Sequence, residues 1–237
     1  MGTLYNPSIV KSGLVLYLDA GNKKSYAGTG NNWYDLSPQK NHCTLQTGTA
    51  AFSNGGIYFD MSTFWRGSDK GFNYGINPST QIVWSRPATV SANKIMFYYG
   101  TSNTSQARGM EVLGTSNYRF WGYGNDQDSG LSMTLNTWNM AVAVYQGSTT
   151  PYQRTYLNDR TGNTGGLSWN TTSTGYYYVG ADTGYVVGTR AWYGNIGIVM
   201  TYNRTLSANE ILQNYYANKG RFGLWVYHII QVYQDMD

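Results

Sequence analysis

Gly194-Asn-Ile-Gly-Ile-Val-Met-Thr-Tyr-Asn-Arg-Thr-Leu-Ser-Ala-Asn-Glu-Ile211 is the stretch of this chain that decides its fold. Its first half is rich in β-branched and aromatic residues, which is typical of a strand packed inside a β-sandwich. Its second half contains Ser207-Ala-Asn-Glu210, a capping-box sequence in which each residue's side chain accepts the other's amide hydrogen. The stretch therefore predicts a core strand followed by a capped helix over residues 208–218.

The composition of the chain indicates a single all-β domain. Its 237 residues are enough for one large core, and β-sandwiches commonly occupy this length as one domain. Only 12% of the residues are charged and 16% are aromatic, whereas disordered chains combine few aromatic residues with high net charge. The 29 glycines and 23 tyrosines are typical of a sheet protein with many turns.

Charge and cysteine content exclude several classes of function. The net charge is +4, and the longest basic run is Lys23-Lys24, so no basic patch predicts a nucleic-acid partner. No apolar run approaches the ~18 residues of a membrane span. The lone Cys43 excludes an intrachain disulfide. The N-terminal residues lack a basic region followed by an apolar run, so we expect no signal peptide and synthesis in a cytoplasm.

The distribution of apolar residues and turn signals predicts many short strands, as in a sandwich. Residues 61–80, 126–130 and 158–166 are rich in Gly, Asn and other polar residues and are expected to be loops. The predicted strands lie at 13–19, 56–60, 81–86, 94–99, 109–113, 118–123, 138–146, 154–157, 176–180 and 194–202.

Several segments resemble, in order and spacing, the laminin-G-like domains of the concanavalin A-like lectin/glucanase superfamily, of the kind found in phage and other virion proteins. They are residues 8–22, 25–26, 33–37, 138–145, 154–158, 178–180 and the closing stretch 194–211. The resemblance implies an antiparallel jelly-roll sandwich of two sheets with a short C-terminal helix. We therefore expect a sandwich domain over residues 1–223, followed by a β-prone tail over residues 224–237.

Acidic residues do not form a pattern expected of a glycosidase. Retaining hydrolysis needs two carboxyl groups ~5 Å apart, and the chain contains only two glutamates. Glu210 is assigned to the capping box, and Glu111 has no acidic neighbour at strand spacing. Asp126 and Asp128 lie in a predicted loop. With two histidines and no Gly-x-Ser-x-Gly sequence, a nucleophilic triad is not predicted either, so we expect no catalytic residues and no enzyme activity.

A calcium site is predicted in the polar stretch after the first strand. Asp19, Asn22, Asp35 and Asn41 offer the carboxylate and amide oxygens that calcium prefers, and related domains often hold a calcium ion at a sandwich edge. In the alternative interpretation Asp19 and Asp35 cap turns through hydrogen bonds from the backbone.

A sugar site is predicted where the strand at 118–123 meets the next loop. Trp121 and Tyr123 offer aromatic faces for a pyranose ring, and Asn125 and Asp126 offer groups that bind hydroxyls. In the alternative interpretation Trp121 belongs to the core or to an interface, since some of the many aromatic residues are exposed by chance.

The tail is strongly apolar and β-prone, with Trp225, Tyr227, Ile229 and Val232 as its candidate assembly contacts. One interpretation is an extra strand of the domain's own sheet. The other is an assembly arm that contacts a neighbouring subunit, since an uncovered apolar strand promotes aggregation.

The resemblance implies a non-enzymatic structural protein of a virion, acting as a capsid decoration protein or a fibre or adhesin component. Its expected partners are other virion proteins or further copies of the chain, and its expected location is the virion. The alternative is a lectin-like module that binds host glycans. The fold itself is compatible with many functions, so the virion prediction depends on the resemblance.

Overall fold

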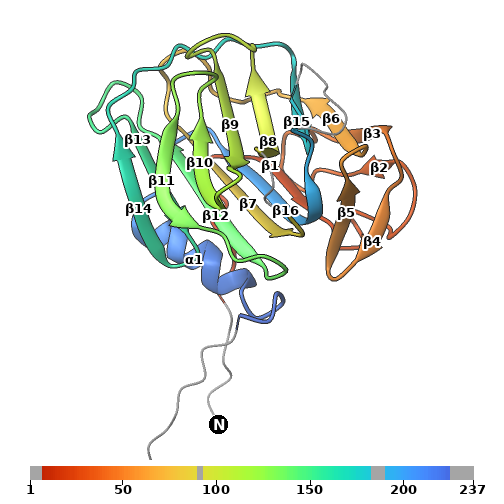
Figure 1. Cartoon of the computed structure of the whole chain (residues 1–237). Coiled ribbons are helices and arrows are strands. Elements are labelled where there is room, and N and C mark those ends of the chain that lie inside the picture. Colours follow the sequence, from red (N-terminus) through yellow and green to blue (C-terminus); the bar gives the residue numbers. More distant parts are fainter. Residues whose placement is uncertain (1–6, 90–92, 183–189, 225–237) are drawn as a thin grey trace, which may run out of the picture.

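The computed structural model of the chain describes residues 7–89, 93–182 and 190–224, which form a sandwich of two antiparallel sheets and one helix (Figure 1). The first sheet has the order β14-β13-β12-β7-β16-β5-β4, with β1 paired to β16. The second sheet has the order β11-β10-β9-β8-β15-β6-β3-β2. The predicted fold class, an all-β jelly-roll sandwich with a short C-terminal helix, is confirmed.

The bounds of the elements agree with most of the predicted strands. The first sheet consists of β1 (Leu14–Asp19), β4 (Ala51–Ser53), β5 (Gly56–Asp60), β7 (Ser79–Pro87), β12 (Asn139–Tyr145), β13 (Gln153–Leu157), β14 (Arg160–Gly165) and β16 (Tyr193–Tyr202). The second consists of β2 (Asn32–Trp33), β3 (Cys43–Thr47), β6 (Phe64–Ser68), β8 (Lys94–Gly100), β9 (Ala107–Val112), β10 (Asn117–Trp121), β11 (Gln127–Ser132) and β15 (Tyr176–Val179).

Strand β16 is the centre of the first sheet, as the opening stretch of sequence predicts. It pairs with β7 along its length, while its other edge pairs first with β5 at Tyr193–Ile196 and then with β1 at Ile198–Tyr202. Every residue from Gly194 to Tyr202 is buried. A strand with ladder partners on both edges and packed side chains on both faces reads as a nearly continuous apolar run.

The helix α1 (Ala208–Asn218) begins with the predicted capping box. Glu210 N donates to Ser207 Oγ at 3.3 Å, and Ser207 N donates to Glu210 Oε2 at 2.9 Å. Arg204 Nη2 lies 2.5 Å from Glu210 Oε1. The hydrogen bond from Arg204, together with those from Ser207, lowers the pKa of Glu210 to about 2.

The helix and the turn after it cover the outer face of the first sheet (Figure 1). Trp84 of β7 stacks on Tyr215 with 5.8 Å between ring centroids, and on Phe222 with 4.6 Å. Phe222 also contacts Trp138, at 4.3 Å between centroids. A second, larger cluster of apolar residues, rich in tryptophan, fills the space between the two sheets.

Three segments expected to be loops contain strands. β6 lies within residues 61–80, β11 overlaps residues 126–130, and β14 lies within residues 158–166. β11 and β14 are polar and largely exposed, so their sequences lack the apolar alternation that identifies a half-buried strand. Hydrogen bonds to β10 and β13 hold them in the sheets.

The tail residues Trp225, Tyr227, Ile229 and Val232 lie outside the described residues. Leu224, directly before them, packs against the cluster beneath the helix. Within the described part of the chain, no helix combines the length and hydropathy needed to cross a bilayer.

Candidate functional site

A row of aromatic side chains crosses the outer face of the second sheet. Alternate residues of its strands point away from the core, so aromatic residues at matching positions meet side by side. Neighbouring ring centroids along the row are separated by 6.5, 6.1, 5.2 and 5.3 Å. In order across the sheet, the row consists of Phe64, Tyr178, Tyr98, Trp121 and Tyr123.

The strand register brings the middle of the row together. Tyr98 and Trp121 both pair with Gly109, from its two sides. A Cβ atom at Gly109 would lie 2.6 Å from Trp121 Cε3. The absence of a side chain at Gly109 therefore lets the indole ring pack onto β9 and reach Tyr98.

A cavity of about 210 Å³ opens at one end of this row, and its walls are Trp121, Tyr123, Thr104, Gly124 and Arg190. Tyr123 is half-buried with a φ of 58°, and Gly124 has a φ of 92°. Such left-handed backbone is uncommon for a tyrosine and often marks a functional turn. The left-handed φ of Gly124, rather than a lack of space beside Thr104, is what favours glycine at this position.

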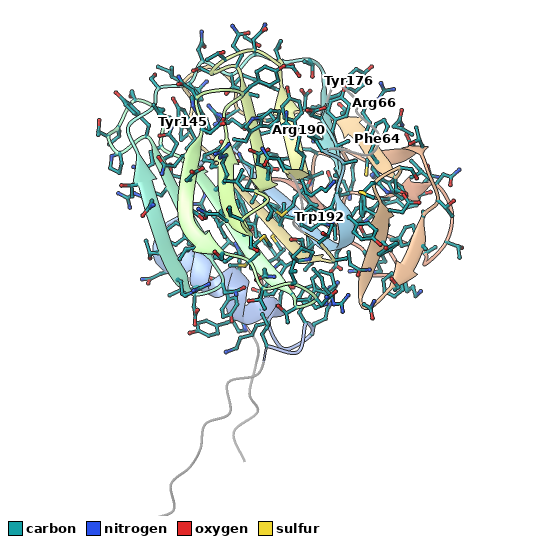
Figure 2. The ribbon with its side chains drawn as sticks, viewed as in Figure 1. Phe64, Arg66, Tyr145, Tyr176, Arg190 and Trp192 are labelled. Carbon is teal, nitrogen blue, oxygen red and sulfur yellow. The ribbon has the colours of Figure 1, made fainter. Side chains whose placement is uncertain are left out.

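Trp121 is part of the wall of the cavity, although it is only 4% exposed. The Arg190 guanidinium lies 4.4 Å from the centroid of its ring. Most of the indole therefore packs on protein, as the core interpretation predicts, and the rest lines the cavity. Figure 2 shows Arg190 toward the middle of the sheet, and Phe64, Arg66 and Tyr176 grouped at the opposite end of the row.

A network of charged side chains borders the cavity. Glu111, whose side chain is 1% exposed, accepts from Arg190 Nη2 at 3.0 Å and Arg119 Nη1 at 3.3 Å. Burial raises the pKa of Glu111, against the opposing effect of Arg190 and Arg119. Arg119 also pairs with Asp126 at 3.2 Å and Asp128 at 2.5 Å. Register places Arg119 directly across from both Glu111 and Asp128, so the sheet itself assembles the network.

Two of the four residues predicted to bind sugar line the cavity, and two do not. Asn125 Nδ2 donates to Ser105 Oγ at 2.7 Å, and the Asn125 carbonyl accepts from Trp169 Nε1 at 2.9 Å. Asp126 Oδ1 accepts from Gly122 N at 3.0 Å. Asn125 and Asp126 therefore hold the β10–β11 turn in shape, and Trp121 and Tyr123 form the wall.

The four residues predicted to bind calcium form hydrogen bonds with the protein. Asp35 Oδ1 accepts from Tyr17 N at 2.7 Å and Ser37 N at 2.8 Å. Asp35 Oδ2 accepts from Ser37 Oγ at 2.6 Å and Asn41 N at 2.7 Å. These hydrogen bonds correspond to the turn-capping alternative for Asp35.

The other three residues predicted to bind calcium also form hydrogen bonds or ion pairs with the protein. Asp19 accepts from Gly21 N at 3.0 Å and pairs with Arg221 at 2.6 Å, and Asn22 Oδ1 accepts from Lys24 N at 3.0 Å. Asn41 Nδ2 donates to two main-chain carbonyl groups. Among the residues that the structure describes, no cluster of three His, Cys, Asp or Glu side chains is placed to hold a metal ion.

Sequence reasoning did not find Thr104, Gly124 and Arg190 as members of the site. Thr104 lies in the β8–β9 loop and Arg190 precedes β16, far along the chain from Trp121. Gly124 carried a signal in the Trp-Gly-Tyr-Gly sequence at 121–124, because glycines beside aromatic residues favour unusual turn geometry.

Comparison with solved structures shows the same fold in proteins of low sequence identity. Domain 4 of AbnA, an extracellular GH43 arabinanase from Geobacillus stearothermophilus solved with arabinotriose, aligns with a TM-score of 0.65 and 13% identity, over 86% of this chain and 99% of that one. Trypanosoma rangeli sialidase with 2,3-difluorosialic acid aligns with a TM-score of 0.66 and 14% identity, over 89% of this chain and 34% of the sialidase.

The binding domain of botulinum neurotoxin serotype D aligns with a TM-score of 0.59 and 12% identity, over 87% of this chain and 52% of that domain. This chain thus spans about a third of the sialidase and about half of the toxin domain. No curated protein sequence matches the chain.

The sequence profile of one protein family matches residues 69–212, more than half of the chain. The matched region begins directly after β6, includes β7 to β16 and ends within α1. It therefore contains both aromatic residues of the cavity, Trp121 and Tyr123. With its two antiparallel sheets and closing helix, the chain belongs to the concanavalin A-like lectin/glucanases superfamily.

Proposed function

We propose that the chain is a non-enzymatic carbohydrate-binding module whose site is the cavity walled by Trp121 and Tyr123. The observation that carries the proposal is an aromatic wall facing polar groups in one small cavity. The negative face of the half-buried Tyr123 ring can attract the weakly positive C–H face of a sugar, whereas the Arg190 guanidinium already lies over the Trp121 ring. The Thr104 hydroxyl, the main chain at Gly124 and the Arg190 guanidinium can bind the sugar's hydroxyl groups.

The size of the cavity suits one sugar unit, since sites for drug-sized ligands are about 300–1,000 Å³ and this one is about 210 Å³. Further units would extend over the sheet toward Tyr178 and Phe64, which are half-buried. The arabinanase domain, nearly all of which aligns with this chain, was solved with a trisaccharide, and that likeness supports an oligosaccharide ligand.

Two observations support binding without hydrolysis. The Glu111 carboxylate is buried and already pairs with two arginines, so it is not placed to protonate a leaving group. Asp126 and Asp128 pair with Arg119 in the same network. A glycosidase needs an accessible carboxyl pair on the two sides of the scissile bond.

A glycan array followed by calorimetric titration of the full chain tests this proposal. We expect a sub-millimolar Kd for at least one oligosaccharide, about tenfold weaker binding by Tyr123→Ala, and a smaller loss in Thr104→Val. Tyr216→Ala removes an exposed tyrosine from the helix on the other sheet and is the control. The proposal is contradicted if no glycan on the array binds, or if Tyr123→Ala binds with an unchanged Kd.

We further propose assembly into a virion as a second function, supported by the family resemblance and by the apolar sequence of residues 225–237. Deleting residues 224–237 is expected to leave a folded chain that no longer joins purified particles, as measured by co-sedimentation. An insoluble product would instead assign the tail to the core of this domain and contradict the assembly arm.

A further inference from the structure

A second and larger cavity, of about 500 Å³, lies beside β1 and shares no lining residue with the proposed sugar site. It is bounded by β1, the segment before it and the turn after Asp35. Tyr17 and Ile9, in its wall, pack against the cluster on the outer face of the first sheet. Its volume falls within the range of about 300–1,000 Å³ typical of small-molecule sites. The wall consists of Ile9, Leu14, Tyr17, Leu36 and Pro38, together with Lys11, Ser37 and Lys40.

The charged groups of this wall are both positive. Lys11 and Lys40 are exposed, and neither forms an ion pair with a described residue. Among the described residues, no carboxylate belongs to the wall. The nearby acids are already satisfied: Asp19 pairs with Arg221 at 2.6 Å, and Asp35 accepts four hydrogen bonds. The cavity therefore combines an apolar surface with an uncompensated positive charge.

The phenol of Tyr17 adds no negative charge. Its hydroxyl donates to Asp19 Oδ2 at 3.1 Å. Burial, followed by the effect of Asp19, raises the pKa of Tyr17 far above neutrality, so the phenol remains protonated.

The rim that carries Lys40 is held in one shape by local hydrogen bonds. Ser37 Oγ donates to Asp35 and accepts from Gln39 N at 3.2 Å. Lys40 has a φ of 56°, a left-handed conformation that is uncommon for a lysine. The turn thus sets the position of the Lys40 backbone at the rim, and a rim that is already ordered loses less conformational entropy when a ligand binds.

We propose that this cavity binds a small apolar anion: a hydrocarbon chain or ring system carrying one carboxylate, sulfate or phosphate group. The apolar body lies against Leu14, Tyr17 and Leu36, and the anionic group lies between the Lys11 and Lys40 ammonium groups. An anionic group gains binding energy from charge-assisted hydrogen bonds with these two lysines. A neutral molecule with the same carbon skeleton does not form them.

Calorimetric titration of the full chain with octanoate and with 1-octanol tests the proposal, because the two probes share a chain length and differ in charge. We expect saturable one-site binding of octanoate with a sub-millimolar Kd, and about tenfold weaker binding of 1-octanol. The double variant Lys11→Gln/Lys40→Gln is expected to bind octanoate about as weakly as the native chain binds 1-octanol.

The double variant Arg154→Gln/Arg160→Gln is the matched control. It removes the same total charge from exposed positions on β13 and β14, four and five strand spacings from β1, or about 20 Å away. It is expected to bind octanoate like the native chain. Leu36→Trp fills the cavity without changing its charge and is expected to abolish binding.

Equal binding of octanoate and 1-octanol, an unchanged Kd in Lys11→Gln/Lys40→Gln, or no saturable binding would each overturn the proposal. A cavity that is already covered by another part of the chain would also give no saturable binding, and it would overturn the proposal in the same way. Tyr123→Ala, which tests the sugar site on the other sheet, is expected to leave octanoate binding unchanged. The failure of one proposed site is therefore distinguishable from the failure of the other.

Discussion

Asp35 illustrates how one residue can connect distant parts of a sandwich. Its carboxylate is buried and accepts from Tyr17 on β1, from Ser37 in its own turn, and from Asn41 just before β3. The side chain thus ties the edge of the first sheet to the turn that leads into the second. Its residue type is compatible with an oxygen ligand or a turn cap, and the four hydrogen bonds that it accepts correspond to the turn cap.

We expect Asp35→Ala to lower the free energy of unfolding by about 3 kcal/mol, because buried donors lose their acceptor. The loss, measured by thermal unfolding, is expected to be the same in millimolar calcium and in a chelator. Asp159→Ala, at an exposed turn, is the control. A calcium-dependent difference that disappears in Asp35→Ala would instead support the predicted metal site.

Glu210 provides a pH-dependent test. Its pKa is lowered from an ordinary value of 4.5 to about 2, chiefly by Arg204, so the folded state binds fewer protons than the unfolded state. Its contribution is therefore present above pH 4.5 and is lost as the pH falls toward 2. We expect Glu210→Gln to cost about 1 kcal/mol at pH 7, because the cap and the ion pair are both partly exposed.

The difference in stability between Glu210→Gln and the native chain, measured by thermal unfolding, is expected to disappear near pH 2. Asp159→Asn removes a carboxylate from an exposed turn and serves as the control. An equal destabilisation by Glu210→Gln at pH 7 and pH 2.5 would contradict an electrostatic role for the capping box.

At the scale of elements, α1 is predictable in its ends but not in its packing. The capping box sets its start within the sequence itself. Its place on the sheet depends on Gly197 of β16, where a Cβ atom would lie 2.8 Å from the Phe222 ring and 3.0 Å from Trp138. The missing side chain of one strand residue thus makes room for the turn that follows the helix.

Phe222→Ala is expected to destabilise the chain by about 3–5 kcal/mol, since the ring packs on both Trp84 and Trp138. Tyr216→Ala, on the same helix but 41% exposed, is expected to cost far less. Chemical denaturation of both variants measures the difference. Similar losses in the two variants would show that the turn after α1 is not part of the folded core.

The sequence predicted the strands that are buried and rich in apolar residues, and it missed the exposed, polar strands β11 and β14. β8 and β12 are buried along their whole length and β16 from Gly194 to Tyr202, and all three are rich in apolar residues. β14, with the sequence RTGNTG, is an edge strand that contacts solvent, so only hydrogen bonds to β13 make it a strand. An exposed edge strand forms because it pairs with a neighbouring strand. The residue pattern of a single sequence does not show which segment will find such a partner.

At the scale of the whole molecule, the two sheets differ in what covers them. The outer face of the first sheet is covered by α1, whereas the outer face of the second carries the aromatic row and the charged network. The proposed sugar site uses the second sheet's face. The proposed anion site lies at the edge of the first, where β1 pairs with β16.

Hydrogen exchange followed by mass spectrometry tests the predicted hierarchy of stability. The amides of β16 and β7, at the centre of the first sheet and paired on both edges, are expected to exchange slowest. The amides of β14 and β4, at its two ends, are expected to exchange faster by at least about tenfold. Equal protection of β14 and β16 would contradict the order of strands described here.

The sequence by itself determined the fold class, the central strand, the helix with its cap, and the aromatic pair Trp121 and Tyr123. These features are local, because apolar periodicity and capping geometry act within a few residues. Only the tertiary structure decided that Arg190 and Thr104 join that pair, and that Asp35 is saturated with hydrogen bonds. Both outcomes depend on strand register and on loops distant in the chain, and a residue's own sequence neighbours do not encode which partner the sheet will place beside it.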